Sequence, residues 1–270
     1  MPPVFCFIDD SAFELDVFQR CIVPAATHVE FVLGSTYDQV RTVLKQRYPA
    51  AFILDLYGRD PELPASSLPT RRELETEIAQ IPSLDQVYQN LNDFAGDKVN
   101  EYLKRLFHVA DAWRQLFSRV FQKAGQNIRY GLGNLARVRQ EYPAAAAVAY
   151  TRKSMIYDAV EALAHGVDGL SLKPDGPTDE DIYRVTTLAA PALIQQWSSL
   201  AFRRAAGYLS RMKLALYEAG LMEEAQRLAP GGQLSDEARR VIGSRGLRFL
   251  ESAASAWMRS ALEQTAPESL

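Results

Sequence analysis

Five short apolar runs alternate with helical patterns, and this alternation constrains the fold more than any other feature of the sequence. Several of the runs lack the regular exchange of apolar and polar residues that marks a half-exposed strand. Strands buried on both faces of a parallel sheet have this appearance. The runs cover residues 4–8, 30–34, 51–55, 146–150 and 169–173, and the helical patterns cover residues 11–22, 36–47, 131–141 and 154–165. The order predicts an α/β fold, a doubly wound parallel sheet of five strands.

The strand pattern disappears between residues 61 and 128, where the chain is expected to be helical. Apolar residues recur there at steps of three and four, which predicts an amphipathic helix with one face buried by packing. They are Val99, Leu103, Leu106, Ala110, Trp113, Phe117, Val120 and Phe121.

The last part of the chain is also expected to be helical. Thr178 is a suitable N-cap for a helix that begins near residue 179, and Pro191 is expected either to kink this helix or to begin the next one. Residues 192–219 and 235–263 have helical patterns. We therefore expect three parts: residues 1–60 with 129–190, a helical insertion at 61–128, and a C-terminal helical module at 191–270.

Composition narrows the class of protein only moderately. The chain has 270 residues, a formal charge of -3 and 47% hydrophobic residues, so it can bury a full core. Its overall charge argues against binding to nucleic acid or anionic lipid, and leaves a local basic face open. No apolar run approaches the roughly 20 residues needed to span a bilayer, and the N-terminus lacks the pattern of a signal peptide. We expect a cytoplasmic protein without membrane contact, in which Cys6 is a core residue and Cys6 and Cys21 are reduced.

Polar residues stand at or just beyond the ends of four of the apolar runs. They are Asp9, Asp10, Asp55, Thr151 and Lys173. In a parallel sheet the carboxyl ends of all strands lie at one edge, where ligands bind, so these side chains are expected to converge.

Three carboxylates at close range must bind protons or a cation, and Mg²⁺ is the hard ion that prefers oxygen ligands and bridges to phosphate. One carboxylate could then attack phosphorus to form an acyl phosphate. Lysine would neutralise the phosphoryl oxygens and the threonine hydroxyl would donate to one of them.

These residues resemble the receiver domain of two-component response regulators, the CheY-like, flavodoxin-like fold. The resemblance covers residues 1–60 and 129–190, and the intervals of 45 residues from Asp10 to Asp55 and 22 from Thr151 to Lys173 are similar to those of the family. It implies that Asp9, Asp10, Asp55 and the backbone carbonyl of Tyr57 bind Mg²⁺. It also implies that Asp55 is the phosphoacceptor, Thr151 the switch hydroxyl and Lys173 the partner of the phosphate.

The resemblance further implies that this is a bacterial phosphorelay protein. It is expected not to be an enzyme, because no separate catalytic output domain is recognised in the sequence. Its partners would be a sensor histidine kinase or phosphotransfer protein, and a downstream protein or a second copy bound through the helical segments. Two positions depart from the family pattern: Arg152 follows the switch hydroxyl where a small residue is usual, and Leu170 replaces the usual aromatic residue.

The sequence leaves a second function open and disfavours a third. A pseudo-receiver would keep the fold and act as an interaction scaffold without phosphorylation, as Arg152 and Leu170 suggest. A phosphatase of the haloacid dehalogenase type would need an aspartate two residues after its nucleophile, but Tyr57 holds that position after Asp55.

Overall fold

The computed structural model describes residues 2–59, 67–152, 156–228 and 233–265. They divide into two compact units, Met1–Gly58 with Ile128–Leu270, and Arg59–Asn127. The predicted further boundary near residue 190 falls inside one long helix, α8 (Asp179–Glu218), which continues through Pro191 instead of ending there. Thr178 caps this helix as expected, because its side chain accepts a hydrogen bond from the backbone N–H of Asp181.

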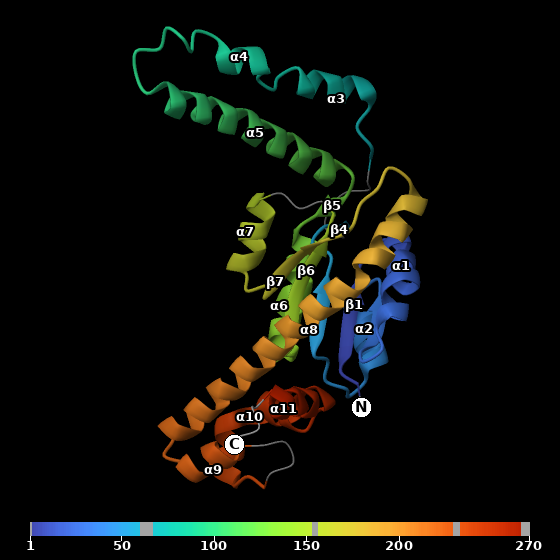
Figure 1. Ribbon diagram of the computed structural model, residues 1–270, viewed down its shortest axis with the longest axis vertical. Helices are drawn as coiled ribbons and strands as arrows, with labels where there is room; N and C mark the ends of the chain where they lie inside the picture. The colour runs from blue at the N-terminus through green and yellow to red at the C-terminus, as the bar shows by residue number, and fades with distance from the viewer. Residues whose placement is uncertain (1, 60–66, 153–155, 229–232, 266–270) are drawn as a thin grey trace. The chain divides into compact units, whose positions relative to one another are not determined.

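The first unit is built on a parallel sheet of five strands, in the order β2-β1-β3-β6-β7 (Figure 1). The strands are β1 (Val4–Ile8), β2 (Glu30–Gly34), β3 (Ala51–Leu54), β6 (Ala146–Thr151) and β7 (Gly169–Leu172). This is the strand order of the flavodoxin-like doubly wound fold, so the predicted fold class is confirmed. β3 and β6 pair directly, with Ala51 opposite Ala146, although the whole second unit lies between them in the chain.

Helices follow the strands as the sequence predicts. They are α1 (Ala12–Val17) with a π-helical turn η1 (Phe18–Ile22) and a short 3₁₀ turn η2 (Val23–Ala25), α2 (Tyr37–Leu44), α6 (Arg129–Glu141) and α7 (Ile156–Ala164). Three shorter helices follow α8: α9 (Met222–Arg227), α10 (Asp236–Leu250) and α11 (Ala253–Thr265). Gly243 interrupts α10 with a φ of 70°, a left-handed conformation that favours glycine.

Aromatic side chains pack on both faces of the sheet. On one face Phe18 stacks on Phe7 at 4.0 Å and on Trp197 of α8 at 5.9 Å, and Trp197 also contacts Tyr150 of β6. The opposite face carries Phe52, because Phe52 pairs with Cys6, and the side chains of neighbouring residues in a strand point to opposite faces. The strands are therefore buried on both sides, as their apolar composition indicates.

The second unit is helical and is bounded by two paired short strands. β4 (Gly58–Arg59) and β5 (Gln126–Asn127) form a two-stranded sheet, and α3 (Arg71–Ile78), α4 (Leu84–Tyr88) and α5 (Lys98–Lys123) lie between them in the chain (Figure 1). Capping boxes at Thr70 and Ser83 begin α3 and α4.

The prediction that α5 buries its apolar stripe is wrong. Leu116 is the buried residue of α5, whereas Val99, Leu106 and Trp113 are 68%, 37% and 37% exposed. The periodicity predicts the helix and its apolar face correctly. It does not establish that another element covers that face. The short helix α4 packs against α5 but leaves the stripe exposed.

Candidate functional site

Backbone hydrogen bonds hold the carboxyl ends of the strands together and so position the predicted site residues. The N–H of Asp9 donates to the carbonyl of Gly34 at 3.2 Å, and the N–H of Asp55 donates to the carbonyl of Ile8 at 3.0 Å. On the other side of β6, the N–H of Lys173 donates to the carbonyl of Thr151 at 3.1 Å. The ladder of the sheet thus continues one residue past the strands, into the residues that carry the polar side chains.

The acids of β1 and β3 meet at this edge. One carboxylate oxygen from each of Asp9, Asp10 and Asp55 lies within 4.8 Å of the others. The Nζ of Lys173 donates to Asp9 at 2.5 Å and to Asp55 at 3.0 Å, and it lies 3.7 Å from a carboxylate oxygen of Glu14. The structure therefore brings four of the five predicted side chains into one cluster, with Glu14 added.

Burial raises the free-energy cost of charge on the side chains of this cluster. The side chains of Asp9, Asp55 and Lys173 are 1%, 6% and 4% exposed. Burial raises the pKa of Asp9 to about 7, the charge of Lys173 opposes this rise, and the charge of Asp55 adds to it. Burial acts to lower the pKa of Lys173, but the negative charges of Asp55, Asp9 and Glu14 outweigh it, so that pKa is raised.

The donor set fits a divalent cation. Asp9, Asp10 and Asp55 offer hard oxygen ligands within reach of one ion. Burial and the charge of Asp55 both raise the pKa of Asp9, so a cation bound there would stabilise the ionised carboxylates. These three carboxylates would hold the ion. The backbone carbonyl of Tyr57 stays a prediction as the fourth ligand. The neighbouring carbonyl of Leu56 accepts a hydrogen bond from the N–H of Gly131.

Thr151 ends β6 at the same edge and is fully buried. Its predicted role as the switch hydroxyl stays a prediction. The residue before it, Tyr150, lies between the site and α8: the Nζ of Lys173 is 5.9 Å from the centre of its ring, and the ring contacts Trp197 edge-on at 5.2 Å.

Arg152 is held by carboxylates at the edge of the site. Its guanidinium donates to Asp175 at 2.6 Å and to Glu14 at 3.1 Å, and its side chain is 21% exposed. Glu14 also faces Lys173. Arg152 therefore adds a second positive charge beside the cluster and is linked to it through Glu14. Leu170 lies in β7 opposite Ala149 and is half-buried, so it brings no ring to the position where the receiver pattern has one.

Sequence reasoning missed two residues that shape the site. Glu14 is in the first turn of α1, and an acid one helical turn after the Asp9–Asp10 pair is the signal that could have found it. Gly131 is the second: a Cβ at this position would lie 2.6 Å from the carbonyl oxygen of Asp55 and 2.6 Å from the Cα of Leu56. The glycine lets α6 approach the end of β3, and its place in "YGLGN" is the only sequence signal.

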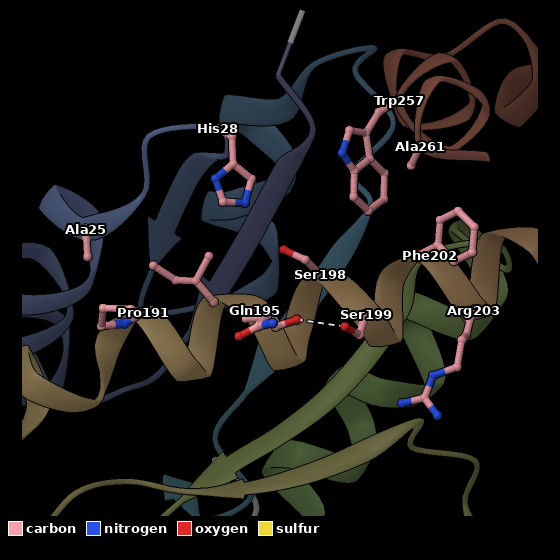
Figure 2. A pocket seen from close by; sticks show the side chains of 11 residues that line it. Ala25, His28, Pro191, Gln195, Ser198, Ser199, Phe202, Arg203, Trp257 and Ala261 are labelled. Carbon is pink, nitrogen blue, oxygen red and sulfur yellow. Dashed lines mark hydrogen bonds between the residues drawn. The ribbon is translucent and has the colours of Figure 1, made fainter. Parts of the chain in front are cut away.

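A separate cavity of about 500 Å³ lies between α8, α11 and the residues after η1 (Figure 2). Trp257 and Phe202 line it with Ile194, and Ser198 points into it from α8. None of the carboxylates of the cluster lines this cavity, so the cavity is distinct from the strand-end cluster.

Comparison with known proteins found likeness only among solved structures. No protein-family model and no curated protein matches the chain. A response regulator from Thermotoga maritima is 9% identical, with a TM-score of 0.36, over 73% of this chain and 99% of the other. A CheY-like receiver domain protein from Methanospirillum hungatei JF-1 is 10% identical, with a TM-score of 0.36, over 74% of this chain and 97% of the other.

A response regulator from Burkholderia pseudomallei, solved with a phosphorylated aspartic acid, a calcium ion and citrate, is 13% identical. Its TM-score is 0.32, over 92% of this chain and 97% of the other. At these scores the fold assignment rests on the strand order, and the candidate site rests on its own geometry. Within the described residues, no helix combines the length and the apolar composition needed to cross a membrane.

Proposed function

We propose that this protein is a phosphorelay receiver that accepts a phosphoryl group on Asp55. The observation that carries the proposal is the cluster in which the Asp55 carboxylate, two further carboxylates and the Lys173 ammonium meet at the carboxyl edge of the sheet. An aspartate in such a cluster can act as a nucleophile toward phosphorus while neighbouring positive charge stabilises the transferring group.

The proposed donor is a phosphohistidine of a sensor kinase or phosphotransfer protein. A carboxylate oxygen of Asp55 forms the new P–O bond while the P–N bond of the donor breaks. The leaving imidazole keeps the electron pair and takes up a proton from solvent. When bound to Asp9, Asp10 and Asp55, Mg²⁺ would neutralise negative charge on the phosphoryl oxygens. Lys173, which already donates to Asp55, keeps the nucleophile oriented and pairs with the phosphoryl group after transfer.

The response to phosphorylation is proposed to pass into α8. Thr151 and Lys173 adjust to the new phosphoryl group, and Tyr150 couples them to Trp197 through the ring contacts described above. Because α8 continues into the C-terminal helices, a small shift of this helix would change the surface offered to a downstream protein.

A pseudo-receiver is the second candidate. The Asp55 side chain is 6% exposed, and Arg152 is bound by Glu14 and Asp175. In that function the buried lysine and acids stabilise the sheet edge, and the protein binds its partners without phosphorylation.

Incubation with acetyl phosphate and Mg²⁺ distinguishes the two. We expect the intact mass of the wild type to increase by one phosphoryl group, and we expect Asp55→Asn to show no increase. Asp175→Asn is the matched control, because Asp175 lies beyond β7 but is 71% exposed and outside the cluster. It should be phosphorylated like the wild type.

Each other outcome has a definite meaning. Phosphorylation of Asp55→Asn would assign the acceptor to another residue. If the wild type gains no mass, and beryllofluoride with Mg²⁺ leaves amide hydrogen exchange around Asp55, Thr151 and Lys173 unchanged, the pseudo-receiver is the correct function.

A further inference from the structure

The exposed stripe of α5 follows a strict heptad spacing. Its residues are separated by steps of four, three, four, three, four and three: Val99, Leu103, Leu106, Ala110, Trp113, Phe117 and Val120. Such alternation averages 3.5 residues, the repeat of a helix that supercoils around another helix. An amphipathic helix that packs on a sheet or an irregular surface needs only the looser 3.6 repeat.

Other elements of the unit contact a different side of α5. Leu116 is buried there, and the salt bridges Arg119–Glu77 and Lys123–Glu73, both 2.9 Å long, join α5 to α3. The heptad residues stay exposed from Val99 to Phe117, with Leu103 and Phe117 each 42% exposed, and Val120 is half-buried. Phe107, beside the stripe, is 69% exposed.

We propose that the heptad stripe of α5 pairs with the same stripe of a second copy of this chain, as an antiparallel two-helix seam. The repeat matches that of a partner helix with the same spacing, and a second copy supplies one at the same concentration. The seam includes no residue of the carboxylate cluster, so this proposal does not rest on phosphorylation of Asp55.

Side-chain sizes favour the antiparallel direction. One antiparallel register places Ala110 against Trp113 of the partner subunit, with Leu106 against Phe117 of the partner subunit in the next layer. Each layer then combines a larger and a smaller side chain, as close packing requires. A parallel pair would instead stack alanine on alanine beside tryptophan on tryptophan, which leaves a void next to an overfilled layer.

Charge does not oppose self-association. Arg105 pairs with Glu101 at 2.8 Å and Arg114 with Asp111 at 2.9 Å, both within α5. In the same register Arg114 lies across from Phe107 of the partner subunit, a pairing of a guanidinium with an aromatic ring that is favourable. No like charges face each other across the seam.

The length of the seam sets the expected strength. It covers 22 residues, roughly 33 Å of helix at 1.5 Å per residue. Such a seam buries on the order of 1,000 Å², the lower limit for a specific interface, so we expect a dissociation constant on the order of micromolar.

Sedimentation velocity of the full chain tests the proposal. Tens of micromolar protein should sediment at twice the monomer mass of 30.2 kDa. Leu106→Glu and Phe117→Glu should each weaken the dimer by at least about 100-fold, because a charge would be buried in the seam. Leu84→Glu is the matched control: Leu84 is an exposed apolar residue of α4, outside the stripe, and its change should leave the dimer intact.

Cysteine cross-linking tests the direction of pairing. The two native cysteines, Cys6 and Cys21, are buried, so an introduced cysteine reports alone. A mixture of Leu106→Cys and Phe117→Cys should form a covalent heterodimer under mild oxidation, whereas Leu106→Cys alone should not cross-link. A monomeric wild type, or a dimer that tolerates both glutamates, overturns the proposal. Cross-linking of Leu106→Cys with itself overturns the antiparallel arrangement. Asp55→Asn should dimerise like the wild type, so loss of phosphorylation does not affect the result.

Discussion

Replacing Lys173 with methionine tests the electrostatic balance of the site. Methionine has a similar length and no charge, so the variant removes the ammonium with little loss of volume. Asp9 and Asp55, which are 1% and 6% exposed, would lose the cation they share. Breaking a buried ion pair by removing one partner costs about 3–5 kcal/mol, because the remaining charge stays buried without compensation. We expect the free energy of unfolding of the first unit to fall by that amount.

A surface ion pair of the same unit is the control. Arg47 donates to Glu30 at 2.5 Å, a distance similar to those in the cluster, but the two side chains are 41% and 45% exposed. Water solvates both groups when the pair is broken, so Arg47→Met should cost less than about 1 kcal/mol. The two variants therefore differ mainly in burial, and burial is expected to decide the result.

Urea unfolding in EDTA at neutral pH measures both effects. A Trp113→Phe background removes the tryptophan of the second unit. The two remaining tryptophans, Trp197, which is fully buried beside Phe18, and Trp257 of α11, then both report on the first unit. If Lys173→Met costs no more than Arg47→Met, the lysine does not balance buried charge and the electrostatic account of the site is wrong. If Mg²⁺ restores stability to Lys173→Met more than to the wild type, the ion replaces the missing positive charge, as the donor set indicates.

Two further predictions concern the close approach at β3 and the helical unit. Gly131→Ala should cost about 1–3 kcal/mol of stability in the same urea assay, because the added Cβ would meet the backbone of Asp55 and Leu56 at 2.6 Å. Gly133 has open space around it, so Gly133→Ala should instead gain about 0.5–1 kcal/mol of helix stability. Equal effects would refute this packing. Hydrogen bonds from Lys123 and Thr70 lower the pKa of Glu73 to about 2, below its unfolded value near 4.5. The ionised Glu73 therefore stabilises α3 fully above pH 4.5, and this stabilisation is lost as the pH falls toward 2. Amide exchange of α3 between pH 5 and 2.5 should show this loss, and Glu73→Gln should remove the pH dependence.

The fold could be predicted because its signals are local. The run 51–55 is apolar because β3 is buried on both faces, and its break at Asp55 marks the edge of the sheet without reference to any other segment. The site followed from one general rule, that parallel strands end at a common edge. The position of Tyr150 between the site and Trp197 could not be found in this way, because it depends on the approach of α8, which no single run of sequence encodes.

The error at α5 has a different origin. Apolar periodicity predicts that a helix has a face that is buried against a partner. It does not predict whether the same chain or another molecule provides that partner. The steps of four and three from Val99 to Val120 already contained the second piece of information, the 3.5 repeat. Trp113 and Phe117 were expected to pack inside the chain, and their exposure turns the same pattern into a prediction of association.

The position of Asp55 does not depend on the inserted unit, and this separates the two proposals. The chain leaves the first unit after Gly58 and returns to it at Ile128, and the pairing of β4 with β5 closes the two ends of the inserted unit. Inserting a segment with closed ends costs mainly loop-closure entropy, which grows slowly with length. Asp55 is instead held within the first unit: its N–H donates to the carbonyl of Ile8 in β1, and the carbonyl of the next residue, Leu56, accepts from the N–H of Gly131 in α6. Chemistry at Asp55 and association through α5 can therefore be removed one at a time, and a variant that loses one should keep the other.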